Sequence, residues 1–129
     1  MKLESAVRYP WLDQGKLWHL CGETAGLFYE VLHVYLHSVA PQGRQLAGTL
    51  QRQAWPELAR QLHSLKGSLQ YLAREPLCQQ VADLEQAALR HDSQQLLRHW
   101  PSLQADLAAL EQEIGDLLAG PPQPLAALG

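Results

Sequence analysis

The chain of 129 residues has the size of a single domain. Leucine dominates its apolar residues, while phenylalanine occurs once and β-branched residues are scarce, so helices are favoured over sheets. A net charge of −3 leaves no basic surplus to neutralise a phosphate backbone, so nucleic acid is not an expected partner.

The apolar stretches do not indicate a signal peptide or a membrane span. Residues 1–10 have no apolar core of signal-peptide length, and polar side chains interrupt the longest apolar stretch, residues 26–40. Cys21 and Cys78 form no CxxC pattern, so we expect reduced, buried thiols. These features predict a cytoplasmic protein that contacts no membrane.

Two helices are predicted in the first half of the chain. A short one is expected near residues 11–20, with Gly22 behind it, and a long one near residues 24–53. Pro41 lies inside the long helix and removes one backbone hydrogen bond, so we expect a kink or a short break near residues 39–41. The inward positions of the long helix are predicted to be Leu27, Val31, Val34, Leu36, Val39, Leu46 and Leu50.

A third helix is predicted from Trp55 and Pro56 to a point before Pro76, because a proline suits the first turn of a helix and disfavours helical geometry in the residue before it. Its leucines recur every three or four residues and therefore mark one buried face. These leucines are Leu58, Leu62, Leu65, Leu69 and Leu72.

Two further helices are predicted in the second half. One runs from Pro76 to near His91, and the next begins at Asp92, which forms a capping box with Gln95. Pro101 is expected to kink or restart this last helix. The inward set of the fourth helix is Leu77, Val81, Leu84 and Ala88. The inward set of the fifth is Leu96, Trp100, Leu103, Leu107, Leu110, Ile114 and Leu117.

These elements predict an all-α fold, an antiparallel four-helix bundle with an additional short N-terminal helix. We assign residues 1–10 to an N-terminal extension and residues 11–119 to the bundle. Residues 120–129, rich in proline and alanine, are expected to form a disordered tail. A bundle that buries its own apolar faces is expected to be a monomer.

The candidate functional residue is His63. At about 100° per residue, it points roughly 140° away from the centre of the leucine face of its helix, so it faces solvent. Lys66 lies three residues after His63, whereas no aspartate or glutamate lies three or four residues from it. Such an imidazole, without an acidic neighbour, is suited to anionic chemistry rather than to metal binding. The other residues placed on its face are Ala59, Gly67, Gln70 and Arg74.

Gly67 strengthens this interpretation. A glycine inside a helix costs about 1 kcal/mol relative to alanine. Gly67 lies one turn from His63, where a side chain would shade the imidazole. The absence of a side chain at Gly67 leaves room for a bulky partner group.

Residues 63–68, His-Ser-Leu-Lys-Gly-Ser, resemble the H-x-L-K-G-S/A signature of histidine-phosphotransfer (HPt) domains. The resemblance extends over roughly residues 11–118. The following helix resembles the L…C…LE pattern of the family, and residues 28–38 with Pro41 resemble its long helix before the site. Trp55 falls where the family often has an acidic–aromatic pair. The residues that match the L…C…LE pattern are Leu77, Cys78, Leu84 and Glu85.

Several positions depart from the family pattern. Leu62 stands where a small alanine usually precedes the histidine, and Ala54 replaces a frequent aspartate. Tyr71, Ala73 and Arg74 replace the common Asn-x-Gly-Ala run. The acceptor, the lysine and the glycine are all kept, so these differences concern partner specificity more than phosphotransfer.

The resemblance implies a phosphocarrier rather than an independent enzyme. His63 would take a phosphoryl group from a receiver-domain aspartate and pass it on within a two-component phosphorelay. Lys66 would meet the phosphoryl oxygens, Gly67 would give steric access, and Gln70 would supply a hydrogen bond. The chain would need no cofactor of its own, with Mg²⁺ in the partner receiver domain. The expected partners are response-regulator receiver domains and hybrid sensor kinases.

Three alternatives follow from the same residues. The first is an adaptor that docks receiver domains or kinases without carrying phosphate. The second, an autokinase, is disfavoured because Ser64 rather than an acid follows the histidine and no glycine-rich nucleotide-binding segment exists. The third, a metal- or haem-binding bundle, would need more ligands than His33 and His37 at their i, i+4 spacing. Glu85 is expected to be a solvated helix residue, with a supporting role allowed by its match to the family pattern.

Overall fold

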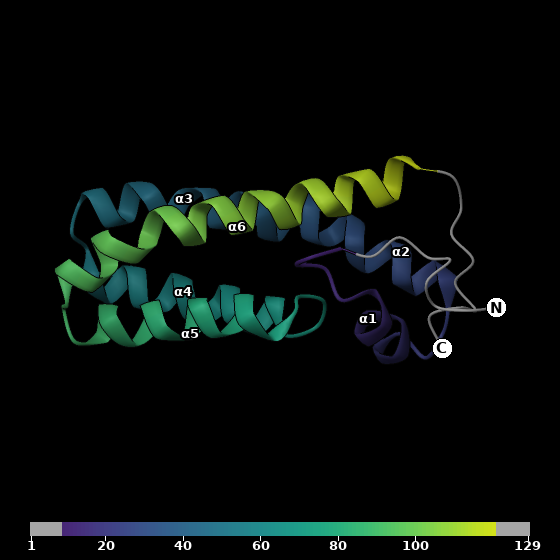
Figure 1. The fold of residues 1–129 in the computed structure, drawn as a ribbon, viewed down its shortest axis with the longest axis horizontal. Helices are drawn as coiled ribbons and strands as arrows, with labels where there is room; N and C mark the ends of the chain where they lie inside the picture. Colours follow the sequence, from purple (N-terminus) through teal and green to yellow (C-terminus); the bar gives the residue numbers. More distant parts are fainter. Residues whose placement is uncertain (1–8, 121–129) are drawn as a thin grey trace.

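The computed structural model describes residues 9–120, which are helical almost throughout (Figure 1). The predicted extension over residues 1–10 and tail over residues 120–129 fall almost entirely outside the described residues. The helices are α1 (Gln14–Leu20), α2 (Ala25–Val34), the π-helical turn η2 (Tyr35–Val39), α3 (Ala40–Gln51), α4 (Trp55–Leu69), α5 (Glu75–Leu89) and α6 (Ser93–Ala119).

The long helices form the predicted bundle, with α1 added at one end. The segments α2, η2 and α3 follow one another without a break and act as a single long helix. Helix α4 packs against α3 and α5, and α6 packs against α5 and, less closely, α3, so α4 and α6 lie on opposite corners of the bundle. In Figure 1, α1 lies beyond the turn between α4 and α5, next to α2. The all-α bundle with a short N-terminal helix is confirmed.

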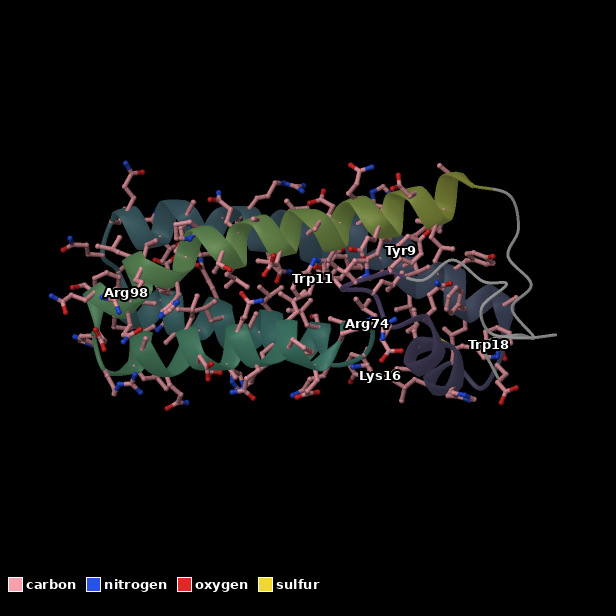
Figure 2. The ribbon with its side chains drawn as sticks, in the orientation of Figure 1. Tyr9, Trp11, Lys16, Trp18, Arg74 and Arg98 are labelled. Carbon is pink, nitrogen blue, oxygen red and sulfur yellow. The ribbon has the colours of Figure 1, made fainter. Side chains whose placement is uncertain are left out.

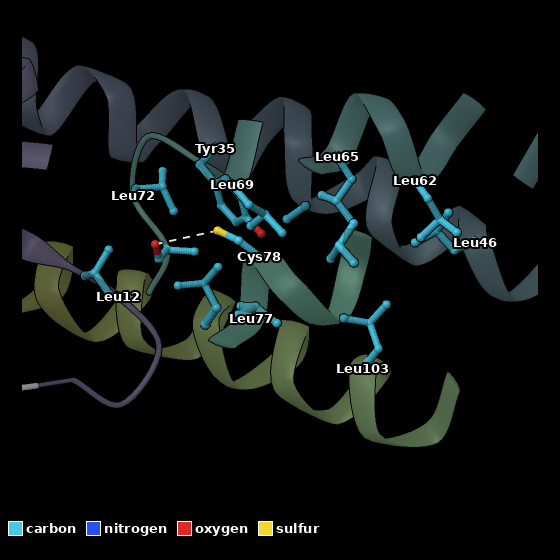
Figure 3. Packing of buried hydrophobic residues seen from close by; sticks show 14 of the residues in the cluster. Leu12, Tyr35, Leu46, Leu62, Leu65, Leu69, Leu72, Leu77, Cys78 and Leu103 are labelled. Carbon is cyan, nitrogen blue, oxygen red and sulfur yellow. Dashed lines mark hydrogen bonds between the residues drawn. The ribbon is translucent and has the colours of Figure 1, made fainter. Parts of the chain in front are cut away.

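The core is built mainly from leucine, as the helical period predicts. The five leucines assigned to the inward face of the third helix are all buried, and so are the four inward residues of the fourth. Figure 3 shows Leu62, Leu65 and Leu69 of α4 pointing toward the interior between the helices. Both cysteines are buried and free. This core fixes α4 so that its opposite face is the exposed one.

Helix α4 ends at Leu69, earlier than the position of Pro76 requires. The reason is an exchange of backbone partners with the N-terminal segment. The Asp13 N–H donates to the Leu72 carbonyl at 2.8 Å, and the Arg74 N–H donates to the Trp11 carbonyl at 2.8 Å. Leu72 therefore reaches the core from a turn rather than from a helix.

The predicted inward face of the long helix is wrong in its first part. Leu27 and Val34 are exposed, and the buried face of α2 and η2 is instead formed by Phe28, Leu32 and Tyr35. The irregularity expected at residues 39–41 is the π-helical turn η2, which directly precedes α3, with Pro41 in the first turn of α3. A proline lacks the N–H that a regular helical ladder would use, so an irregular turn next to it is expected.

Helix α6 runs without interruption through Pro101, so the expectation of a restart there is wrong. The cap at its start is confirmed, since the Asp92 carboxylate accepts from the Gln95 N–H at 3.2 Å. Of the predicted inward set, Trp100 and Leu107 are only half-buried and the others are buried.

An extended segment at the start of the described chain, residues 9–13, crosses the end of the bundle. The Trp11 and Leu12 N–H groups both donate to Glu113 Oε1, each at 3.0 Å. The Arg74 guanidinium donates to the Tyr9 carbonyl at 2.8 Å (Figure 2). This segment, which we term the N-terminal strap, joins α6 to the turn between α4 and α5.

Candidate functional site

The exposed face of α4 carries His63, whose side chain is 71% exposed. The predicted orientation is therefore correct. Two residues assigned to the same face are not part of the site, because Ala59 is buried and Arg74 is engaged with Tyr9 in the strap.

A carboxylate from the neighbouring helix contacts His63. Glu85 of α5 places its Oε2 2.9 Å from the Nδ1 of His63. Its Oε1 lies 2.7 Å from the Nζ of Lys66. The side chain of Glu85 is only 9% exposed, so it is a buried acid with both oxygens engaged. The interpretation of His63 as lacking an acidic neighbour, and of Glu85 as a solvated residue, is wrong.

The electrostatics of this triad keep Glu85 ionised. Burial by itself would raise the pKa of Glu85, but hydrogen bonds and charge interactions with Lys66 and His63 outweigh burial and lower that pKa below its usual value. A buried carboxylate would be costly without these two partners. The ion pair with Lys66 in turn holds the ammonium beside the imidazole.

An ionised carboxylate has no proton to donate, so Nδ1 of His63 must donate to Glu85. In the neutral ring, this leaves the lone pair on Nε2. Since Nδ1 is engaged and most of the side chain is exposed, Nε2 is the ring nitrogen available to a partner molecule. The contact therefore selects one tautomer and one nucleophilic atom.

Gly67 and Gln70 lie on the same side of α4 as His63. Apart from its two chain neighbours and the backbone of its own helix, no described heavy atom lies within 4 Å of the position that a Cβ of Gly67 would occupy, so the space there is open. Gln70 is the exposed C-terminal cap of α4, and its side chain has no hydrogen bond to His63. The structure thus brings Lys66 and Gly67 close to the imidazole along the helix, and gives Gln70 no contact with it.

Sequence spacing did not identify Glu85 as a neighbour of His63, because the two residues are 22 positions apart. Helical spacing identifies neighbours on one helix and is silent about a facing helix. The one available signal was the match of Glu85 to the L…C…LE pattern of the resemblance, combined with its position at the edge of the buried face of α5.

The other histidines form no comparable cluster. His33 and His37 are exposed, with their rings stacked at a centroid distance of 6.2 Å. Within residues 9–120, no group of three or more His, Cys, Asp or Glu side chains is arranged to hold a metal ion. None of the helices in that range combines the length and apolar character that a membrane crossing requires.

A comparison with protein families gives one match. The family model described as "Hpt domain" matches residues 30–120, which span most of the chain and include the three residues of the triad. Neither a curated protein nor a solved structure matches the sequence significantly.

Proposed function

Because this chain belongs to the Hpt domain family, whose members perform histidine phosphotransfer in two-component systems, we propose that His63 is its phosphoryl acceptor. The observation that carries the proposal is the contact between the exposed imidazole and the buried Glu85 carboxylate, which leaves Nε2 free. The donor is the acyl phosphate of a receiver-domain aspartate.

In the proposed step, the Nε2 lone pair attacks phosphorus in line with the bond to the aspartate oxygen. The new N–P bond forms as the P–O bond breaks, and the electron pair of that bond returns to the aspartate as carboxylate. Nδ1 keeps its proton throughout, so no general base is needed. Reversal of the same step passes the group to a second receiver domain.

Glu85 and Lys66 have separate tasks in this step. The ring becomes positively charged as Nε2 bonds to phosphorus, and the Glu85 carboxylate stabilises that charge through Nδ1–H, as carboxylates do for catalytic histidines. Lys66 neutralises charge on the phosphoryl oxygens as a point charge. Glu85 is a positioning residue, since its two oxygens already bind the histidine and the lysine.

The Mg²⁺ that the reaction needs belongs, in this proposal, to the receiver domain, where carboxylates would hold it. The partners are receiver domains and hybrid sensor kinases, and the protein acts as a cytoplasmic monomer. Gln70 at the end of α4 is proposed to hydrogen-bond the partner.

The test is incubation with phosphorylated receiver domains and Mg²⁺. Label on this chain that is acid-labile and base-stable, and that is lost in His63→Ala, is the expected result. Label that persists in His63→Ala would overturn the acceptor assignment. Binding to receivers without any label across a broad panel would favour the adaptor.

A further inference from the structure

The surface beside His63 differs on its two sides. Toward α5, Glu85 and Lys66 fill the space between the helices. Toward α3 there is an open hollow of about 290 Å³. We term it the α3–α4 hollow, and its lining residues are Gln42, Gln45, Arg60, Gln61 and Ser64. Ser64 directly follows the proposed acceptor, so the hollow borders the site.

The hollow is lined by polar side chains, and its only charged residue is basic. Arg60 is exposed and has no ion pair or hydrogen bond with any residue that the structure describes. Other arginines near the same seam are neutralised, since Arg52 pairs with Glu57 at 3.3 Å and Arg44 with Glu111 at 2.6 Å. Arg60 is therefore an uncompensated cation one turn before His63, in a chain with a net charge of −3.

A second polar group in the hollow lacks a partner. Gln61 Oε1 is buried and accepts no hydrogen bond from residues 9–120. A buried acceptor without a donor is costly, so a donor supplied by an occupant would be favourable. Gln45 and Gln61 also line a second hollow of about 370 Å³, in which Glu57 is paired with Arg52 at 3.3 Å, so the polar depression continues along the same seam.

We propose that the α3–α4 hollow is the docking site for an acidic extended segment of the receiver domain. A carboxylate of that segment pairs with Arg60, and the glutamine side chains hydrogen-bond its backbone. Charge complementarity supports this occupant, because a domain that holds Mg²⁺ with carboxylates has acidic groups around its phosphorylated aspartate. The inference rests on the proposed function, and it makes Arg60 a residue of partner recognition rather than of chemistry.

The experiment measures transfer from the phosphorylated receiver domain that labels this chain best. Arg60→Glu should lower kcat/KM on the order of tenfold and flatten its salt dependence, while the rate at saturating receiver stays unchanged. Gln45→Glu should act in the same direction from α3, where it cannot disturb the His63 helix turn. Arg98→Glu, which makes the same charge change on α6 across the bundle (Figure 2), is the matched control and should leave kcat/KM unaltered.

The outcomes separate the two proposals. If the wild-type chain accepts no label from any receiver, the proposed function fails. If the wild-type chain is labelled but Arg60→Glu and Gln45→Glu behave like Arg98→Glu, the docking site is refuted and the function stands. A fall in the saturating rate of Arg60→Glu with an unchanged KM would place Arg60 in the chemistry and would also overturn the docking assignment.

Discussion

The two sides of α4 differ in whether their polar groups already have partners within the described chain. On the α5 side, a buried carboxylate binds His63 and Lys66 at 2.9 and 2.7 Å, and all three polar groups have partners. On the α3 side, Arg60 has no partner among the described residues and a buried Gln61 oxygen accepts no hydrogen bond. The first flank is complete within the chain, whereas the second becomes complete only with an occupant.

This difference separates chemistry from recognition. In the proposed function, a preorganised triad would not need to rearrange when the phosphoryl group arrives, and it would act in the same way with each partner. An open polar surface gains its hydrogen bonds only from a matching partner and therefore discriminates between partners. Changes on the α5 side should alter the rate of transfer, and changes on the α3 side should alter which receivers are used.

The largest effect on the α5 side should come from His63→Gln. Transfer should be abolished, because the amide has no nucleophilic nitrogen in place of Nε2. The free energy of unfolding should hardly change, because the side chain is 71% exposed. Label transfer and chemical denaturation measure the two quantities, and residual label would contradict the assignment.

Gly67→Leu should come next, with transfer blocked although the protein folds. Helical side chains lean toward the N-terminus, so a leucine here would cover the imidazole one turn earlier. The space at Gly67 is open to a Cβ, so the start of the new side chain meets no other part of the described chain.

Gly67→Ala is the matched control for this variant. It should raise the free energy of unfolding by about 0.5–1 kcal/mol with a smaller loss of rate. A normal rate in the leucine variant would refute the steric role of the glycine.

Glu85→Ala should slow transfer on the order of ten- to hundredfold, by analogy with the loss seen when a hydrogen-bond partner of a metal-ligating histidine is removed. The effect should appear in the rate at saturating receiver, with KM nearly unchanged. NMR of the imidazole should show loss of the single tautomer that has its proton on Nδ1, a change that a purely structural role would not produce. An unchanged tautomer would contradict the positioning role.

Lys66→Ala should slow transfer roughly tenfold without abolishing it, since one of several charges that stabilise the phosphoryl oxygens is lost. Single-turnover transfer measures this rate. Lys66→Arg should recover part of it, because the positive charge is kept. Equal rates in the two variants would show that charge at this position is unimportant.

The smallest effect concerns stability and pH. The pKa of Glu85 is lowered in the folded state, so its ionised form stabilises the fold above its ordinary pKa of 4.5. This contribution is lost as the pH falls through the lowered value. The difference in unfolding free energy between the wild type and Glu85→Gln should be about 1–2 kcal/mol at pH 7 and vanish in acid. A difference independent of pH between 7 and 3 would be inconsistent with this assignment.

Periodicity was sufficient for features contained within one helix. The leucines of α4 are buried and His63 is exposed, because one strongly amphipathic helix has only one way to face the core. It failed in α2, where apolar residues occur on two faces and Leu27 and Phe28 both fit a helical repeat. Only packing against Trp18, at a ring distance of 5.9 Å, identifies Phe28 as the inward residue.

Features that depend on two segments could not be read from spacing. Glu85 meets His63 across a helix pair, and α4 ends at Leu69 because residues 11 and 13 take over backbone hydrogen bonds of the following turn. Both contacts join residues far apart in the sequence, and neither follows from the properties of a single helix.

The N-terminal strap has a consequence for how the chain is made. Its acceptor, Glu113, lies 102 residues after Trp11. During synthesis, which proceeds from the N-terminus, the amides of Trp11 and Leu12 have no native acceptor until nearly all of α6 has left the ribosome. The strap therefore cannot bind α6 before Glu113 has been made, so a chain that ends before Glu113 would lack the link between α6 and the end of α4.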